Sequence, residues 1–338
     1  MTARSSVSVA ETDPLSQVAA VPGVDDAATS ARAAVDTLLR HRVLRRSSAE
    51  VTAEASLRAA RASAALEGHD IPLDVLRAHL GDQLADGEQV PAGAGAATGQ
   101  PAGQAATSTD STDGRSLAVT LGAVRLYAEL GTLSSAWERA PRQALARMHL
   151  LAGRGLLPDA VLGRPRADGQ PVGAPGAAGA AGQQPPPPSA LPTPPWAMSA
   201  PAVSAAEMSA RLDGLTAVLT GPTKAPAIVV AAVTHGELLA IRPFGALDGI
   251  IARAAARLVL ISRGLDPKAL VATDVGHLEL AQGGGDEAAA PVADYGAALA
   301  AYLAGGAEGV GIWVRHCAGA VALAARESLA VCEAISRA

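Results

Sequence analysis

The chain has 338 residues, a net charge of −5, a hydrophobic content of 49% and an aromatic content of 2%. An acidic chain without a basic block is a poor partner for nucleic acid, so we expect no nucleic-acid partner. No apolar run is long enough to cross a bilayer, so we expect no membrane partner either. No apolar segment typical of a signal peptide appears near the N-terminus, which predicts a cytoplasmic location. With so few aromatic residues, the core must consist of Ala, Leu, Val and Ile, which suits closely packed helices.

The first third of the chain predicts helices bounded by segments of low complexity. We expect residues 1–30 to be disordered, because they are polar and lack a periodic pattern. Residues 31–87 should form N-terminal helices, since apolar residues recur at helical spacing from Ala31 to about Leu66. Residues 88–114 are rich in Gly, Ala, Ser and Thr and are interpreted as a flexible insert.

Residues 115–336 predict a helical core that is interrupted by a Pro-, Gly- and Ala-rich insert at about 165–200. Two helices are expected over residues 116–152, with Pro141 in the first turn of the second one. No repeat and no alternating strand pattern occurs, so the predicted class is all-α, with or without a small β-hairpin near the second insert. Further helices are expected over residues 205–219, 226–241, 250–263, 292–304 and 308–336.

The two cysteines, Cys317 and Cys332, both fall in the last helical segment. A straight helix holds two residues at that spacing too far apart for a disulfide bond. In a reducing compartment they should be free, partly buried thiols. We therefore expect neither a disulfide nor a metal site from this pair.

The segment HGELLAIRPFGALDGIIAR, residues 235–253, predicts a helix, a tight turn and a second helix. It resembles the signature of the Fic (Fido) family, HPFx[D/E]GNGRxxR, which lies on a loop between two central helices. Upstream, Met148–Leu150 together with Gly163–Arg166 resembles the segment that precedes the flap of that family. The resemblance implies a Fic-like helical bundle. The positions that match the signature and the residues before it are His235, Ile241, Pro243, Phe244, Gly249 and Arg253.

A third segment, Ser63–Gly68 (SAALEG), matches the family's inhibitory-helix pattern [S/T]xxxE[G/N]. The resemblance implies that Glu67 pairs with the last arginine of the motif, Arg253. We therefore predict a direct ion pair that joins the N-terminal helix to the helix after the motif loop. The regulatory residues implied by this pattern are Ser63, Glu67 and Gly68.

The resemblance also implies transfer of AMP from ATP, with Mg²⁺ on the phosphates, to a protein hydroxyl. The residues that this reaction needs are largely replaced. Arg242 stands at the position of the histidine base, and a guanidinium has no lone pair that could accept a proton. Ala246 stands where a carboxylate should hold Mg²⁺, which weakens the case for ATP and Mg²⁺ as cofactors. Leu247 replaces the first glycine of the phosphate-binding turn, and Ile250 replaces the first of two arginines.

The candidates that remain for binding a phosphate group are Arg242, Gly249 and Arg253. Arg242 is alternatively a cation that caps the helix end. Asp248 is either a catalytic base or metal ligand, or an N-cap or turn residue, and the second interpretation is preferred. His235 is interpreted as a core histidine because it shares an apolar stripe with its helix neighbours. For Arg257 two interpretations stay open, a residue on a solvated helix face and a residue of the site.

Two functional hypotheses follow. The first is a Fic-fold protein that lacks AMP-transferase activity and has a regulatory or scaffolding role. The second is a Fic-fold enzyme with altered chemistry that transfers a nucleotidyl or phosphoryl group to a protein target, with Asp248 as the base and Arg242 and Arg253 on the phosphate. A protein target or a second copy of the chain is the expected partner. A dinucleotide-dependent oxidoreductase is disfavoured, because the glycine runs at 93–98 and 153–158 do not follow strands.

Overall fold

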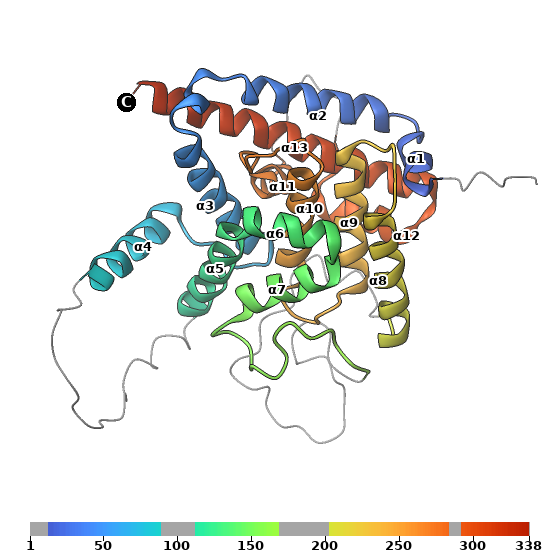
Figure 1. Cartoon of the computed structure of the whole chain (residues 1–338), viewed down its shortest axis with the longest axis horizontal. Coiled ribbons are helices and arrows are strands. Elements are labelled where there is room, and N and C mark those ends of the chain that lie inside the picture. The colour runs from blue at the N-terminus through green and yellow to red at the C-terminus, as the bar shows by residue number, and fades with distance from the viewer. Residues whose placement is uncertain (1–12, 89–111, 169–202, 284–291, 338) are drawn as a thin grey trace, which may run out of the picture.

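The computed structural model describes residues 13–88, 112–168, 203–283 and 292–337, which assemble into one helical structure (Figure 1). Within these ranges there are helices and no strands, so the predicted all-α class is confirmed. The α-helices are α1 Pro14–Ala19, α2 Val24–Leu39, α3 Ser48–Leu66, α4 Leu73–Glu88, α5 Thr112–Ala128, α6 Leu130–Arg139, α7 Pro141–Gly153, α8 Ala205–Thr220, α9 Ala227–Ile241, α10 Asp248–Ser262, α11 Thr273–Ala281, α12 Tyr295–Ala304 and α13 Gly306–Arg337.

The two inserts lie almost wholly outside the described residues. The insert predicted at 88–114 overlaps them only at the end of α4 and the start of α5. The insert at 165–200 overlaps them only at residues 165–168, which form no strand. The β-hairpin that was considered next to this insert is therefore not found in the part of the chain that the structure describes.

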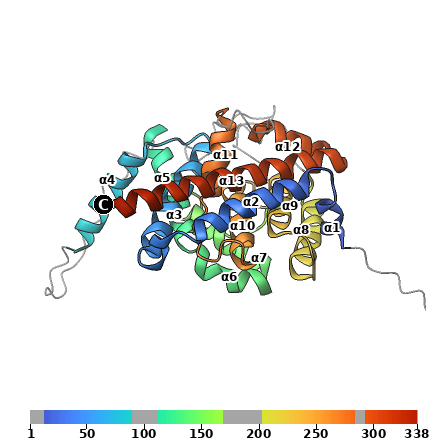
Figure 2. The same ribbon diagram turned by 90° about the horizontal axis from the view of Figure 1, so that it is seen from above.

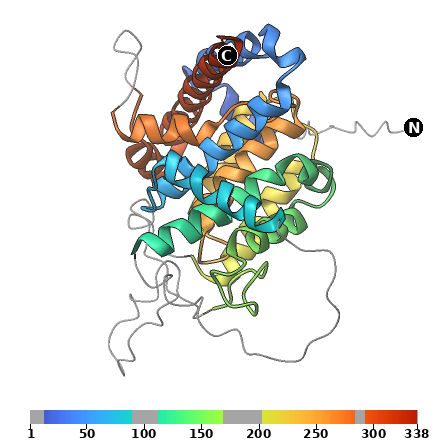
Figure 3. The same cartoon turned by 90° about the vertical axis from the view of Figure 1, so that its left-hand side faces the viewer.

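The prediction that residues 1–30 are disordered is wrong for residues 13–30, which contain α1 and the first part of α2. The buried side chains of α2 recur at three- and four-residue spacing and face α13. Figure 2 shows the blue α2 running along the dark red α13, and in Figure 3 both lie at the top of the molecule. The apolar stripe of α2 is mostly alanine and valine, so it gains stability from its partner helix rather than from its own composition. These buried residues are Val24, Ala28, Ala31, Val35 and Leu38.

The helix predicted from Ala31 to Leu66 is divided into two, and the break follows a local capping signal. α2 ends at Leu39, and His41 then accepts a hydrogen bond from the backbone N–H of Val43 through Nδ1 (3.4 Å) at the start of a short 3₁₀ turn, Arg42–Arg45. α3 begins at Ser48 and ends at Leu66, where Gly68 takes the positive φ of +88° that a helix C-terminus favours.

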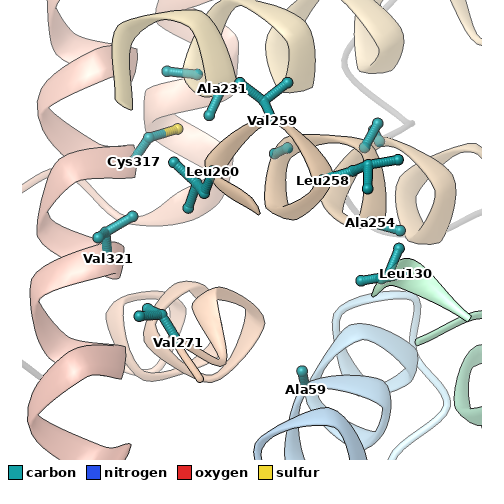
Figure 4. Close-up of a cluster of buried hydrophobic side chains, with 14 of the residues drawn as sticks. Ala59, Leu130, Ala231, Ala254, Leu258, Val259, Leu260, Val271, Cys317 and Val321 are labelled. Atoms are coloured by element: carbon teal, nitrogen blue, oxygen red, sulfur yellow. The ribbon is translucent and has the colours of Figure 1, made fainter. Parts of the chain in front are cut away.

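The central pair of the fold is α9 and α10, whose residues are almost all buried. α6 and α7 pack against α10, and α13 packs against α9. Figure 4 shows Ala231, Val259, Leu260, Cys317 and Val321 meeting where α9, α10 and α13 come together. Small side chains allow this close approach, and they place the loop between α9 and α10 on a rigid support.

Several boundaries differ from the predicted ones. Residues 116–152 form parts of three helices, α5 to α7, rather than two, and Pro141 is the first residue of α7 as predicted. α11 was not predicted, because its pattern is short and contains Gly276. No helix in the described ranges combines the length and the apolarity needed to cross a bilayer.

Candidate functional site

The loop between α9 and α10, residues 242–247, has an unusual backbone. Arg242, Gly245 and Leu247 have φ values of 44°, 78° and 60°. For a residue other than glycine this region costs about 1 kcal/mol or more, so the surrounding packing must hold Arg242 and Leu247 there. Leucine ordinarily disfavours a positive φ, which glycine, the residue of the family at this position, adopts readily. The structure shows that the turn persists with leucine at that position, where the side chain is buried.

Asp248 turns its carboxylate back onto this loop. Its Oδ1 accepts the backbone N–H of Phe244 at 2.9 Å, and the N–H of Gly245 also acts on the carboxylate. Burial raises the pKa of Asp248 to about 7, against the effect of these N–H groups and of the nearby Arg242 guanidinium. Asp248 is the first residue of α10, and its side chain bonds to the loop before the helix rather than capping it, so the interpretation as an N-cap is wrong.

Arg242 is buried at the end of α9, but the cation that caps the helix is Arg166. Nε of Arg166 donates to the carbonyl of Arg242 (3.0 Å), and its Nη2 donates to the carbonyl of Ile241 (3.2 Å). The backbone N–H of Arg166 donates to Pro243 O at 2.8 Å. These contacts satisfy C-terminal carbonyls that a helix leaves open. The sequence segment Gly163–Arg166 contained this residue, but its role depends on a contact across 76 positions.

A second clamp joins α7 to the loop. The ring of His149 stacks on Phe244 with 4.3 Å between centroids and 5° between planes. The backbone N–H of Gly163 donates to His149 Nδ1 at 3.0 Å. Burial lowers the pKa of His149 to about 4, so the ring is neutral near pH 7. The structure therefore brings both segments of the upstream match against the motif loop.

The predicted ion pair between Glu67 and Arg253 is present. Nη2 of Arg253 lies 2.6 Å from Oε1 of Glu67, and the two residues are 1% and 6% exposed. The same guanidinium donates from Nε to the hydroxyl of Ser63 (2.9 Å) and from Nη2 to the carbonyl of Ser63 (2.9 Å). Nη1 donates to the hydroxyl of Tyr295 at 3.2 Å. Each of the three nitrogens of Arg253 therefore has a partner within the protein.

A second acid, Asp274 on α11, completes this cluster. Its Oδ1 accepts a 2.6 Å hydrogen bond from the hydroxyl of Tyr127 and lies 3.5 Å from Arg253 Nε. The sequence contained a signal for this cluster that we did not use. The chain has three tyrosines, and two of them, Tyr127 and Tyr295, are buried around Arg253.

The arrangement of helices around this loop matches a solved structure. A crystal structure of a Fic family protein from Desulfovibrio desulfuricans G20 superposes with a TM-score of 0.57 at 18% identity, over 90% of this chain and 74% of that one. The chain has the Fic fold. At this identity the match concerns the fold alone. No family model and no curated protein matches the sequence.

Three further candidate residues from the sequence, Arg257, His235 and Gly249, are buried. Arg257 is 2% exposed, donates to Ala269 O at 3.2 Å and lies 5.1 Å from the ring centre of Tyr127, so its assignment to a solvated face is wrong. His235 is buried with Nε2 3.0 Å from the hydroxyl of Tyr295, which agrees with its interpretation as a core histidine. Gly249 is buried in the first turn of α10.

The residues of this loop do not fit Mg²⁺ held on a nucleotide. Ala246 offers no ligand atom, and the carboxylate of Asp248, two residues later, is directed to the N–H of Phe244. Leu247 and Ile250 place buried apolar groups where the family has a glycine and an arginine. The structure thus groups the candidates into two clusters. The loop cluster consists of Arg242 and Asp248, and the lock cluster consists of Ser63, Glu67 and Arg253. Glu67 raises the pKa of Asp248, so the two clusters lie within electrostatic range.

Proposed function

We propose that this Fic-fold protein does not transfer AMP and works as a regulatory or scaffolding module whose phosphate-binding site is held closed by its N-terminal helices. The observation that carries the proposal is the state of Arg253. It is fully buried and has all three nitrogens bonded to Ser63, Glu67 and Tyr295. A phosphate group would have to displace these partners before it could reach the guanidinium.

The motif loop supports the same proposal. An anion-binding turn needs free backbone N–H groups that converge on the anion. Here the N–H of Phe244 is taken by Asp248, whose carboxyl group, once ionised above about pH 7, carries charge of the same sign as a phosphate. Such an internal anion competes with the phosphates of a nucleotide and repels them. The histidine base and the metal carboxylate that AMP transfer in the family requires are both replaced, by Arg242 and Ala246.

A labelling experiment tests the proposal. The purified protein is incubated with ATP labelled in the α-phosphate, with Mg²⁺, alone and together with a cell lysate. We expect no labelled protein for the wild type or for Arg242→His, because Ala246 and Leu247 remain unchanged in the variant. Transfer of AMP by either protein would overturn the proposal.

The binding step is tested separately. Glu67→Gly removes the closing carboxylate, and ATP binding is measured by calorimetry. We expect no gain in affinity, since Asp248 still occupies the loop. A gain of tenfold or more, about 1.4 kcal/mol, would show that the pocket accepts a nucleotide and that Glu67 alone excludes it.

A second candidate function is favoured by one observation, the pKa of Asp248, which burial raises to about 7. A carboxyl group with this pKa suits general acid–base catalysis near neutral pH. This candidate is an enzyme of altered chemistry that transfers a nucleotidyl or phosphoryl group to a protein. It requires label transfer from α- or γ-labelled ATP that is lost in Asp248→Asn and retained in Asp159→Asn, which changes an exposed carboxylate.

A further inference from the structure

Three buried side chains with metal-binding atoms meet beside the lock cluster. His235 comes from α9, His277 from α11 and Cys317 from α13, and their ligand atoms all lie within 4.8 Å of one another. The first and the last of these residues are 82 positions apart in the sequence, so no local sequence motif contains all three. The sequence predicted no metal site from the two cysteines, because His235, His277 and Cys317 come together only in the folded chain.

The hydrogen bonds of the neighbouring histidine determine which nitrogen of His277 is available. Nδ1 of His316 lies 2.9 Å from Ala293 O, and a carbonyl oxygen only accepts, so this Nδ1 carries the proton. With the proton on Nδ1, the neutral ring of His316 can only accept at Nε2. His277 Nδ1, 2.9 Å from that Nε2, must therefore donate. In the neutral ring of His277, whose proton is on Nδ1, the lone pair then lies on Nε2.

This pattern is the one that supports histidine ligands in metal sites. A ligating imidazole usually donates its second ring N–H to an acceptor that orients it. Here His277 donates to His316, and His316 donates to the carbonyl of Ala293. The ring of His235 is held by Tyr295, whose hydroxyl also accepts from Arg253. No hydrogen bond within the described ranges uses His277 Nε2, so this atom is free to bind a ligand.

We propose that His235, His277 and Cys317 bind one Zn²⁺ ion that ties α9, α11 and α13 together beside the Glu67–Arg253 pair. Two imidazoles and a thiolate are donors that Zn²⁺ prefers. Ligand atoms around tetrahedral zinc are about 3.3–3.8 Å apart, as follows from bond lengths of about 2.0–2.3 Å. The three donors must therefore close by about 1 Å, through small rotations of the side chains. The cluster contains no fourth His, Cys, Asp or Glu donor in the described residues, so water completes the coordination.

Charge balance around the cluster is compatible with the ion. The Cys317 thiol loses its proton to solvent when the Zn–S bond forms, so the ion and its three ligands carry a net charge of about +1. Asp274 lies one turn before His277 on α11, and its buried Oδ2 has no hydrogen-bond partner among the described residues. Together with Glu67, it supplies negative charge against Arg253 and the ion.

The experiment loads the metal during folding, because the buried cluster offers an ion no open path in the folded chain. The full chain is unfolded with a reducing agent and a chelator, and it is refolded with Zn²⁺, with Co²⁺ or without metal. After desalting we expect one zinc per chain and a higher melting temperature than in the metal-free sample. The cobalt form should show a thiolate-to-cobalt charge-transfer band in the near ultraviolet.

Two cysteine variants provide the test and its matched control. Cys317→Ser should abolish the charge-transfer band and weaken zinc binding at least about tenfold. Cys332→Ser changes a buried cysteine on the same helix outside the cluster and should keep both. Absence of retained metal in the refolded wild type, or equal retention by both variants, would overturn the proposal. If Cys317→Ser does not fold, the cobalt spectrum of the wild type decides, because a spectrum without the thiolate band also overturns it.

Discussion

The residues around Arg253 show how this fold stabilises a buried positive charge. Arg253 is surrounded by two carboxylates, two tyrosines and Ser63, so its charge is compensated inside the protein. Removal of one partner of such a pair leaves an uncompensated buried charge, which costs more than the pair itself contributes. The retained Glu67 therefore has a structural role, whether or not the pocket ever holds a nucleotide.

We expect Glu67→Ala to lower the free energy of unfolding by about 3–5 kcal/mol, because the buried guanidinium loses its closest carboxylate. Asp70→Ala is the matched control. It removes the carboxylate 2.5 Å from Arg61, at the same end of α3, where both side chains are partly exposed. An exposed pair contributes about 1 kcal/mol or less. Urea denaturation measures both variants, and equal losses would contradict the buried role of Glu67.

The raised pKa of Asp248 predicts that the free energy of unfolding depends on pH. Burial raises its pKa to about 7 from the ordinary value of 3.8, so between these values the folded state keeps a proton that the unfolded state has lost. The free energy of unfolding therefore contains a contribution that is present at low pH and is lost as the pH rises through about 7.

Asp248→Asn removes this contribution. Relative to the wild type, the variant should gain about 2–4 kcal/mol between pH 4 and pH 8, because about three pKa units separate the two states. Asp159→Asn, at an exposed position, should show no such change. Denaturant titrations at both pH values provide the measurement, and parallel pH profiles for Asp248→Asn and the wild type would refute the shift.

At the scale of helices, close approach is made possible by glycines at contact points. A Cβ added at Gly276 on α11 would lie 2.0 Å from Ala320 O on α13, and one added at Gly309 on α13 would lie 2.2 Å from Ala301 O on α12. Backbone oxygens at these distances cannot move aside without shifting a helix. The spacing of α11 and α13 also sets the position of His277 and Cys317, so the packing of these helices and the proposed metal site depend on each other.

Gly276→Ala should lower the free energy of unfolding by about 1–3 kcal/mol, because the new methyl group forces the two helices apart. Gly214→Ala, in α8, is the matched control. Gly214 is an exposed helical glycine with nothing within 4 Å of an added Cβ, so alanine should raise stability by about 0.5–1 kcal/mol. Thermal and chemical denaturation distinguish the two signs. A stabilised Gly276→Ala would mean that α11 and α13 are not in close contact.

At the scale of the whole molecule, the central pair α9 and α10 is enclosed by the other helices, while α4 lies at the edge (Figure 1). Within residues 73–82 of α4, Leu76 is the one buried side chain. Helices with few buried contacts open locally at a lower free energy than the core. The N-terminal half is nevertheless connected to the core, because the lock joins α3 to α10.

We expect the amides of α10 to exchange with solvent hydrogen at the rate of global unfolding, and those of residues 73–82 to exchange much faster. The amides near the C-terminal end of α3 should resemble those of α10, since Ser63 and Glu67 are bonded to Arg253. Hydrogen exchange followed by mass spectrometry measures this pattern. Fast exchange at the end of α3 would show that the lock opens independently of the core. In that case Glu67→Ala should leave the exchange rates at the end of α3 unchanged.

The sequence by itself determined the helical class, the turn at residues 242–247 and the pairing of Glu67 with Arg253. Helical periodicity and motif spacing are local, and the family resemblance supplied the long-range contact. Packing decided what local pattern could not. α2 is stabilised by α13, Asp248 folds back on its own loop, and Arg166 caps α9 from outside the motif. The meeting of His235, His277 and Cys317 arises only where three helices converge, because their distances depend on the tertiary fold and not on the spacing along the chain.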